Sequence, residues 1–294
     1  MMLEGIHFLL TMRCLEECDH CFVWGSPSFD ATFKPSDIKK ILEEGKKIGV
    51  KWVYFEGGEP FLFYPILVKS VGEARRRGFK VGIVTNGYWA IDLDSALEFL
   101  TPISKVDDLS FSTDCYHPEI LERVRFGVKA SKILGIPVGI ISIEDIHSRE
   151  KLLEVEGISI GYYPLMFKGR ASKNLADKVE KKDWRIFKEC PYEDLRNPKR
   201  VHVDPYGYVH VCQGITIGNT SKTPFSEIVQ KYSPFLNPIL KVLCEGGPVS
   251  LAKFFKLSHK KSYADACHMC YAMREKLRLK FPEILSPPQM YGEF

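Results

Sequence analysis

Residues 6–21, IHFLLTMRCLEECDHC, decide the fold, because a short apolar run leads directly into three closely spaced cysteines. The run at 6–10 has the composition of a buried strand. Cys14, Cys18 and Cys21 then fall within eight residues, so one loop carries three thiols. Soft thiolates favour zinc or iron–sulfur clusters. Because a [4Fe–4S] cluster normally takes four cysteines, three leave one iron open to a ligand.

A zinc ion held by the three thiols and completed by His20 or His117 is the alternative. A CxxxCxxC triplet directly after a first strand favours the cluster, since zinc knuckles usually pair cysteines as CxxC. We therefore predict that Cys14, Cys18 and Cys21 bind a [4Fe–4S] cluster.

Around this loop, β-rich runs alternate with amphipathic stretches over about the first 165 residues, as expected for βα units. Strands are predicted at 6–11, 51–55, 80–85, 107–112, 138–143 and 158–163. Helices are predicted between them at 35–48, 64–77 and 118–134. Right-handed crossovers make successive strands parallel. The fold class is therefore α/β, a partial (β/α)6 TIM barrel whose functional residues follow the strands.

Polar, lysine-rich sequence at 171–182 predicts a boundary between a core at 1–171 and a smaller cluster-binding unit at 172–294. In that unit, predicted strands at 201–204 and 208–212 flank a hairpin signal at 205–207. Helices are predicted at 225–232 and 271–280. Further cysteines in this unit are candidate metal ligands: Cys190, Cys212, Cys267 and Cys270.

Three motifs follow predicted strands of the core. GGEP at 57–60 joins glycines, which let a main chain approach a ligand closely, to a carboxylate suited to an ammonium group. TNG at 85–87 could be a type I′ turn, but no matching antiparallel strand follows it. SFSTD at 110–114 places polar side chains after the fourth strand.

On these motifs, residues 6–171 resemble the radical S-adenosylmethionine (radical SAM) superfamily, whose hallmark is CxxxCxxC after the first barrel strand. The resemblance implies that GGEP receives the methionyl amino group and that His20 stacks on adenine. The implied cofactor contacts are Gly57, Gly58, Glu59, Pro60, Asn86, Ser112, Asp114 and His20. It also implies that one electron from the cluster breaks the C5′–S bond of S-adenosylmethionine. The resulting 5′-deoxyadenosyl radical would abstract hydrogen from a substrate, with a reductase, ferredoxin or flavodoxin as electron donor.

The late cysteines resemble those of the shortened auxiliary-cluster domain called Twitch, or half of a SPASM domain. This implies a second, auxiliary [4Fe–4S] cluster at Cys190, Cys212, Cys267 and Cys270, although Cys244 could replace Cys190. Zinc is an alternative, and a redox-active CxxC pair is disfavoured because no strand precedes it. Four protein ligands would close this cluster to substrate. Its role would then be electron transfer, which favours net oxidation or crosslinking.

Cys115 follows Asp114 at the catalytic end of the fourth predicted strand, where its thiol could donate a hydrogen atom to an intermediate. The alternative is a buried small side chain without a catalytic role.

Composition argues against several classes of partner. The net charge is +4 over 294 residues, and the densest basic run, at 75–77, falls on a predicted helix face. We therefore expect no nucleic-acid partner. No apolar run reaches the ~18 residues of a membrane span, and no amino-terminal signal is present, so we expect a cytoplasmic protein without a membrane partner. In that reducing compartment nine cysteines favour metal ligands over disulfides.

The sequence thus predicts a radical SAM oxidoreductase that acts on a small molecule or on a peptide or protein residue. The alternatives are a peptide maturase that forms a crosslink, a non-catalytic iron–sulfur carrier and a zinc-structured binding protein. No leader-binding domain precedes residue 6, which favours a small molecule or a protein side chain. The chain ends YGEF, unlike the Gly-Gly end of the molybdenum-cofactor cyclase of the same superfamily.

Overall fold

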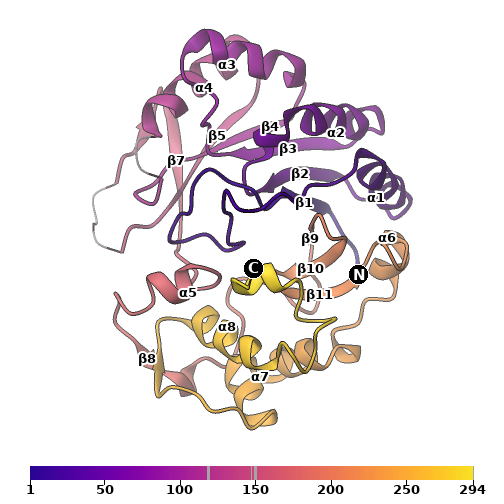
Figure 1. Ribbon diagram of the computed structural model, residues 1–294, viewed down its shortest axis with the longest axis vertical. Helices are drawn as coiled ribbons and strands as arrows, with labels where there is room; N and C mark the ends of the chain where they lie inside the picture. Colours follow the sequence, from indigo (N-terminus) through magenta and orange to yellow (C-terminus); the bar gives the residue numbers. More distant parts are fainter. Residues whose placement is uncertain (118–119, 147, 149–150, 294) are drawn as a thin grey trace.

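Parallel strands form the centre of the protein. The computed structural model describes residues 1–117, 120–146, 148 and 151–293. The central strands are β1 (Gly5–Thr11), β2 (Trp52–Gly57), β3 (Lys80–Thr85), β4 (Asp108–Ser112), β5 (Val138–Ile143) and β7 (Ile158–Tyr163). Each pairs in parallel with the next, and Figure 1 shows them in the upper half of the molecule. The predicted strands and the predicted α/β partial barrel are confirmed.

Helices connect these strands and cover the outer face of the sheet (Figure 1). They are α1 (Pro35–Lys47), α2 (Tyr64–Arg76), α3 (Leu93–Leu100) and α4 (Leu121–Ile133). Helix α1 begins at Pro35 and buries Ile38 and Leu42 against the sheet, as predicted. The sequence prediction missed α3, whose first turn is capped by Asp92 through the backbone N–H of Ser95. Of the predicted helix at 118–134, residues 118 and 119 lie outside the described residues.

The carboxy-terminal hairpin extends the same sheet. Strand β9 (Arg200–Val203) pairs in parallel with β1, with His202 opposite His7, and β10 (Tyr208–Cys212) pairs antiparallel with β9. The hairpin is therefore confirmed, whereas the next strand, β11 (Ile215–Asn219), was not predicted. With the short β6 (Glu154–Val155), the order is β11-β10-β9-β1-β2-β3-β4-β5-β7-β6. The two predicted units thus share a sheet, and their boundary at 171/172 remains a prediction.

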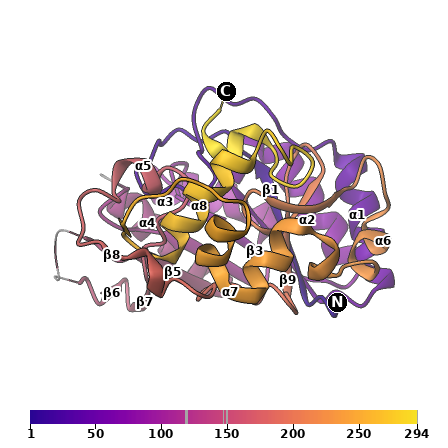
Figure 2. The same cartoon turned by 90° about the horizontal axis from the view of Figure 1, so that it is seen from below.

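The remaining elements pack beneath the hairpin side of the barrel, where Figure 2 views α7 and α8 from below. They are α5 (Ala171–Asn174), α6 (Phe225–Gln230), α7 (Pro238–Phe254), α8 (Ala266–Leu277), β8 (Lys182–Asp183) and β12 (Ser262–Tyr263). Short 3-10 turns lie at Pro60–Phe63, Thr101–Ile103, Trp184–Ile186, Pro234–Leu236 and Pro288–Tyr291. The predicted start of the last helix at 271 was wrong. Asp265 caps the helix through the N–H of His268, so both cysteines of the CxxC pair lie within α8.

Candidate functional site

The three early cysteines line one cavity at the carboxyl ends of the barrel strands. This cavity has a volume of about 280 Å³. The loop curls because the N–H of Cys21 donates to the carbonyl of Cys18 at 3.0 Å, and the N–H of Cys14 donates to Ser26 at 3.2 Å. Burial raises the pKa of the Cys14 thiol to about 12 and raises that of Cys18. These buried thiols would become thiolates only when a metal centre replaces their protons.

The second wall of this cavity is the GGEP segment, which hydrogen-bonds to the start of the cysteine loop. The N–H of Gly58 donates to Thr11 at 2.7 Å, and the N–H of Glu59 donates to Arg13 at 2.8 Å. A Cβ added to Gly58 would lie 2.1 Å from the carbonyl oxygen of Arg13. Gly58 is therefore required for contact between two loops, in addition to lining the cavity beside Gly57.

The carboxylate of Glu59 is fully buried and does not line the cavity. It accepts hydrogen bonds from the N–H of Phe61 at 3.0 Å, the hydroxyl of Thr85 at 2.9 Å and the N–H of Asn86 at 2.8 Å. Burial raises the pKa of Glu59 to about 7, and the three donors act to lower it. In this structure Glu59 holds the loop after β3, so its predicted contact with a ligand amino group remains a prediction. Pro60 is buried and starts a 3-10 turn.

The other predicted cofactor contacts do line the cavity: Asn86, Ser112, Asp114 and His20. The amide nitrogen Nδ2 of Asn86 lies 3.8 Å from the sulfur of Cys14. Asp114 faces both histidines that were considered as zinc ligands. Its carboxylate is 2.9 Å from Nδ1 of His117 and 3.9 Å from Nε2 of His20. Burial lowers the pKa of His20 to about 4, which keeps a neutral ring in the cavity.

The distances between possible ligand atoms indicate which residues could bind a single metal ion in this structure. A zinc ion binds thiolates at about 2.3 Å, so two such sulfurs lie no more than about 4.6 Å apart. Within the described residues, three ligand atoms lie within 4.8 Å of one another only in two sets without cysteine. These sets are His7–Glu56–His202 and His20–Asp114–His117. No three cysteine sulfurs of the described residues therefore lie this close together in the structure.

Sequence reasoning missed Glu56, which lines the same cavity from β2. Its two carboxylate oxygens lie 3.2 Å from Nδ1 of His7 and 3.1 Å from Nε2 of His202. Although burial raises the pKa of Glu56, the two imidazoles hold it well below its usual range. Glu56 is thus an ionised carboxylate facing the cavity. His202 reaches Glu56 because β9 pairs with β1. The sequence did not reveal this pairing.

The four late cysteines line a second, smaller cavity, as predicted from their grouping: Cys190, Cys212, Cys267 and Cys270. Cys212 ends β10, and the CxxC pair lies in the first turns of α8. Cys244 lies elsewhere on α7, where its carbonyl accepts from Arg196 at 2.7 Å. Of the two cysteines between which the sequence left the choice open, Cys190 lines this cavity and Cys244 does not, and the ligand assignment remains a prediction.

The segment at 168–171 (KGRA) contacts the early cysteine loop and lines the cavity of the late cysteines. The guanidinium of Arg170 donates to the carbonyl of Cys18 at 2.9 Å and to that of Gly25 at 2.8 Å. Its own N–H donates to Cys21 at 2.9 Å. Two residues earlier, Lys168 is buried and lines the cavity of the late cysteines. One short segment therefore fixes the early cysteine loop and reaches the second site.

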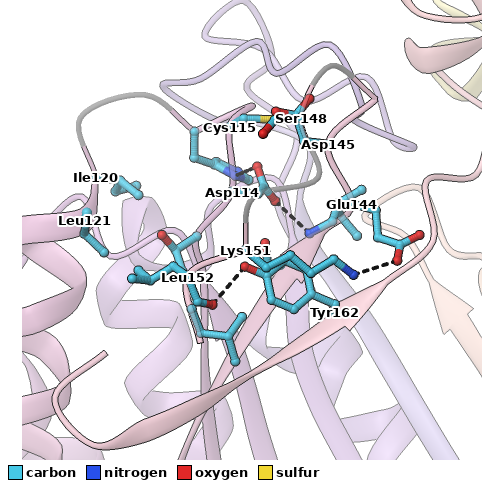
Figure 3. Close-up of a pocket in the computed structure, with 15 residues that line it drawn as sticks. Asp114, Cys115, Ile120, Leu121, Glu144, Asp145, Ser148, Lys151, Leu152 and Tyr162 are labelled. Carbon is cyan, nitrogen blue, oxygen red and sulfur yellow. Dashed lines mark hydrogen bonds and ion pairs between the residues drawn. The ribbon is translucent and has the colours of Figure 1, made fainter. Parts of the chain in front are cut away.

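Cys115 lies apart from the early cysteines. It is exposed and lines a separate cavity of about 600 Å³ beside β4, β5 and β7. Figure 3 shows Cys115 at the upper rim, with Asp114 next to it and Lys151 paired with Glu144 below. Burial raises the pKa of the Cys115 thiol to about 11. Because Asp114 lines both cavities, Cys115 borders the first cavity without entering it.

Comparisons with known proteins agree with this geometry. Residues 8–136 match the family model described as the Radical SAM superfamily. YydG of Bacillus subtilis (strain 168), named for peptide biosynthesis, is 24% identical over 246 residues, covering 76% of this chain and 73% of YydG. A protein of Methanothermobacter marburgensis named as a GTP 3′,8-cyclase is 30% identical over 144 residues, 46% of each chain.

A solved structure supports the fold alone. Native anSMEcpe with bound AdoMet superposes with a TM-score of 0.55 at 13% identity, covering 95% of this chain and 97% of that one. No described helix of this protein is both long enough and apolar enough to span a membrane.

Proposed function

Because this chain belongs to the radical SAM superfamily, we propose that it oxidises a substrate by hydrogen abstraction, using two iron–sulfur centres. A [4Fe–4S] cluster and S-adenosylmethionine are the cofactors of the superfamily and therefore of this chain. Our proposal assigns the cluster to Cys14, Cys18 and Cys21. The observation that carries it is one cavity walled by these thiols and by the GGEP loop.

The donor set fits that cluster better than zinc. Three thiols without a fourth protein ligand leave room for S-adenosylmethionine on one iron. The two histidines that could complete a zinc site lie beside Asp114 instead. Bound there, the cofactors supply a 5′-deoxyadenosyl radical. The chain's own task is to hold the ligand and exclude water, for which Asn86, Ser112 and Asp114 line the wall.

We assign an auxiliary [4Fe–4S] cluster to Cys190, Cys212, Cys267 and Cys270. Four protein ligands leave no open iron, so its chemistry would be one-electron transfer. Oxidation of a C–H bond next to a hydroxyl or amine also releases a proton. Glu56 faces the cavity as an ionised carboxylate paired with His7 and His202. Because these imidazoles lower its pKa, it is a weak proton acceptor, and we assign it the orientation of an amine or hydroxyl group of the substrate.

A peptide residue is the substrate class that we favour, because YydG aligns over most of both chains. A small molecule remains the second candidate, since the GTP 3′,8-cyclase relative is named for a nucleotide reaction. Expectations that still await tests are crosslink formation, the electron donor (a ferredoxin, flavodoxin or reductase), a hydrogen-donating role of Cys115 and a cytoplasmic location.

Anaerobic reconstitution tests the proposal. We expect about eight irons per chain and, after reduction with dithionite, conversion of S-adenosylmethionine to 5′-deoxyadenosine and methionine. The matched control replaces Cys14, Cys18 and Cys21 by alanine, which should leave about four irons and no nucleoside product. Eight irons without nucleoside would instead support an electron carrier. Colourless protein with stoichiometric zinc would support a zinc-structured protein.

A further inference from the structure

Two buried cations flank the four-cysteine cavity on α8 and on the segment before α5. Arg274 and Lys168 both line this cavity and are only 1% and 3% exposed. Burying an ammonium or guanidinium group in an apolar site is costly unless negative charge compensates it. Some negatively charged group must therefore balance these two buried cations.

The neighbours of Arg274 do not supply a carboxylate. Its Nη1 donates to the carbonyl of Gln213 at 2.8 Å and to the hydroxyl of Tyr291 at 3.3 Å. Its guanidinium lies 5.5 Å from the ring centroid of Tyr271 and 5.7 Å from that of Tyr291. Its Nε is buried without a hydrogen-bond partner among the described residues. Cys270 lines the same cavity one helical turn before Arg274, and Arg274 acts to lower the pKa of its thiol.

Lys168 has a similar environment in its part of the cavity wall. Its ammonium donates to the side-chain oxygen of Gln213 at 2.7 Å and lies 5.6 Å from the ring centroid of Phe22. Two carboxylates are near this wall, but neither forms an ion pair with it in the described residues. Asp265 accepts backbone N–H groups as the cap of α8, and Glu189 is exposed at the rim. Asp265 interacts electrostatically with Lys168, and the four cysteines, as thiolates of the proposed centre, would supply the further negative charge.

We propose that Arg274 and Lys168 are positioning residues that raise the reduction potential of the four-cysteine centre and so make it the electron acceptor of the reaction. This inference rests on the proposed auxiliary cluster. Adding an electron makes a thiolate-ligated cluster one unit more negative, and nearby buried cations stabilise that state. A unit charge about 10 Å away, at an effective dielectric constant of about 20, changes the equilibrium constant for electron uptake by roughly tenfold.

The same two side chains meet at the residue that follows Cys212. Arg274 binds the backbone oxygen of Gln213, and Lys168 binds its side-chain oxygen. The amide nitrogen of Gln213 lies 3.4 Å from Nε2 of His202, which contacts Glu56. Gln213 therefore contacts both cations, and its side-chain amide lies beside His202, the partner of Glu56 in the first cavity.

Potentiometric titration of the reconstituted holoprotein, followed by electron paramagnetic resonance, tests this inference without a substrate. In Arg274→Met and Lys168→Met, we expect one centre to bind its electron at least about tenfold more weakly, a fall of about 59 mV for a one-electron couple. The other centre should keep its potential. Arg274→Lys retains the charge, so the reduction potential should stay close to that of the unmodified protein. A purely structural role of Arg274 would not predict this result.

The control is Arg278→Met at the residue that follows α8, where the side chain pairs with Glu293 and should not affect either potential. If Arg274→Met does not fold, Lys168→Met carries the test. Eight irons with both potentials equal to those of the Arg278→Met control would overturn the charge assignment alone. About four irons in the unmodified protein would overturn the auxiliary cluster and this inference together.

Discussion

Arg170 offers the sharpest test of how the early cysteine loop is held. Its guanidinium is buried and donates to two carbonyls of that loop, those of Cys18 and Gly25, at 2.9 and 2.8 Å. Arg170→Met keeps much of the side-chain volume but removes both bonds. Hydrogen bonds to charged groups contribute about 1.5–3 kcal/mol each, so the loop should lose about 3–6 kcal/mol.

The assay is iron release to a chelator from the anaerobically reconstituted protein. If the loop must open before iron leaves, a loss of about 3 kcal/mol in loop stability raises the rate of iron release about a hundredfold. In Arg170→Lys, the lysine can reach one of the two carbonyls. Its rate of iron release should therefore lie between those of the unmodified protein and Arg170→Met. Lys173→Met is the control, because its ion pair with Glu275 is half exposed and contributes about 1 kcal/mol or less. Equal release rates in Arg170→Met and Lys173→Met would refute the role assigned to Arg170.

Further substitutions test the rest of the account. Cys190→Ser should lower the iron content from about eight to about four per chain, whereas Cys244→Ser should leave it unchanged; the reverse result would reassign the ligand. Gly58→Ala would place a methyl group 2.1 Å from the carbonyl oxygen of Arg13, so equilibrium dialysis should detect weaker S-adenosylmethionine binding. Glu56→Gln should lower the stability measured by denaturant unfolding at neutral pH. Because the folded-state pKa of Glu56 is depressed, that difference should begin to close only as pH falls below about 4.3, the ordinary value for glutamate; a difference that closes above that pH would contradict the depressed pKa.

The barrel could be predicted because local sequence and fold agree there. The strands at 80–85, 138–143 and 158–163 are rich in Val, Ile and Tyr, and the structure gives the same bounds. Helix α3 escaped prediction because it is short and only partly buried, with Ala96 and Leu100 as its buried residues. The start of α8 was misplaced because the prediction began the helix after the cysteine pair and overlooked Asp265, its cap.

The site was predictable only where residues follow one another in the chain. The CxxxCxxC and GGEP segments identified the first cavity, since each lies directly after a strand. Glu56 with His202, and Arg170 with the carbonyl of Cys18, depend on contacts between distant segments that no local pattern encodes. Sequence could likewise not predict where the Glu59 carboxylate points, because donors on the loop after β3 set its direction.

Cleavage of S-adenosylmethionine by the Cys190→Ser variant tests the central claim most directly, because this variant should retain only the cluster at Cys14, Cys18 and Cys21. We predict about four irons per chain and, after dithionite reduction, 5′-deoxyadenosine and methionine in equal amounts by mass spectrometry. Four irons with no 5′-deoxyadenosine would contradict the assignment of the first cavity as the site of radical generation.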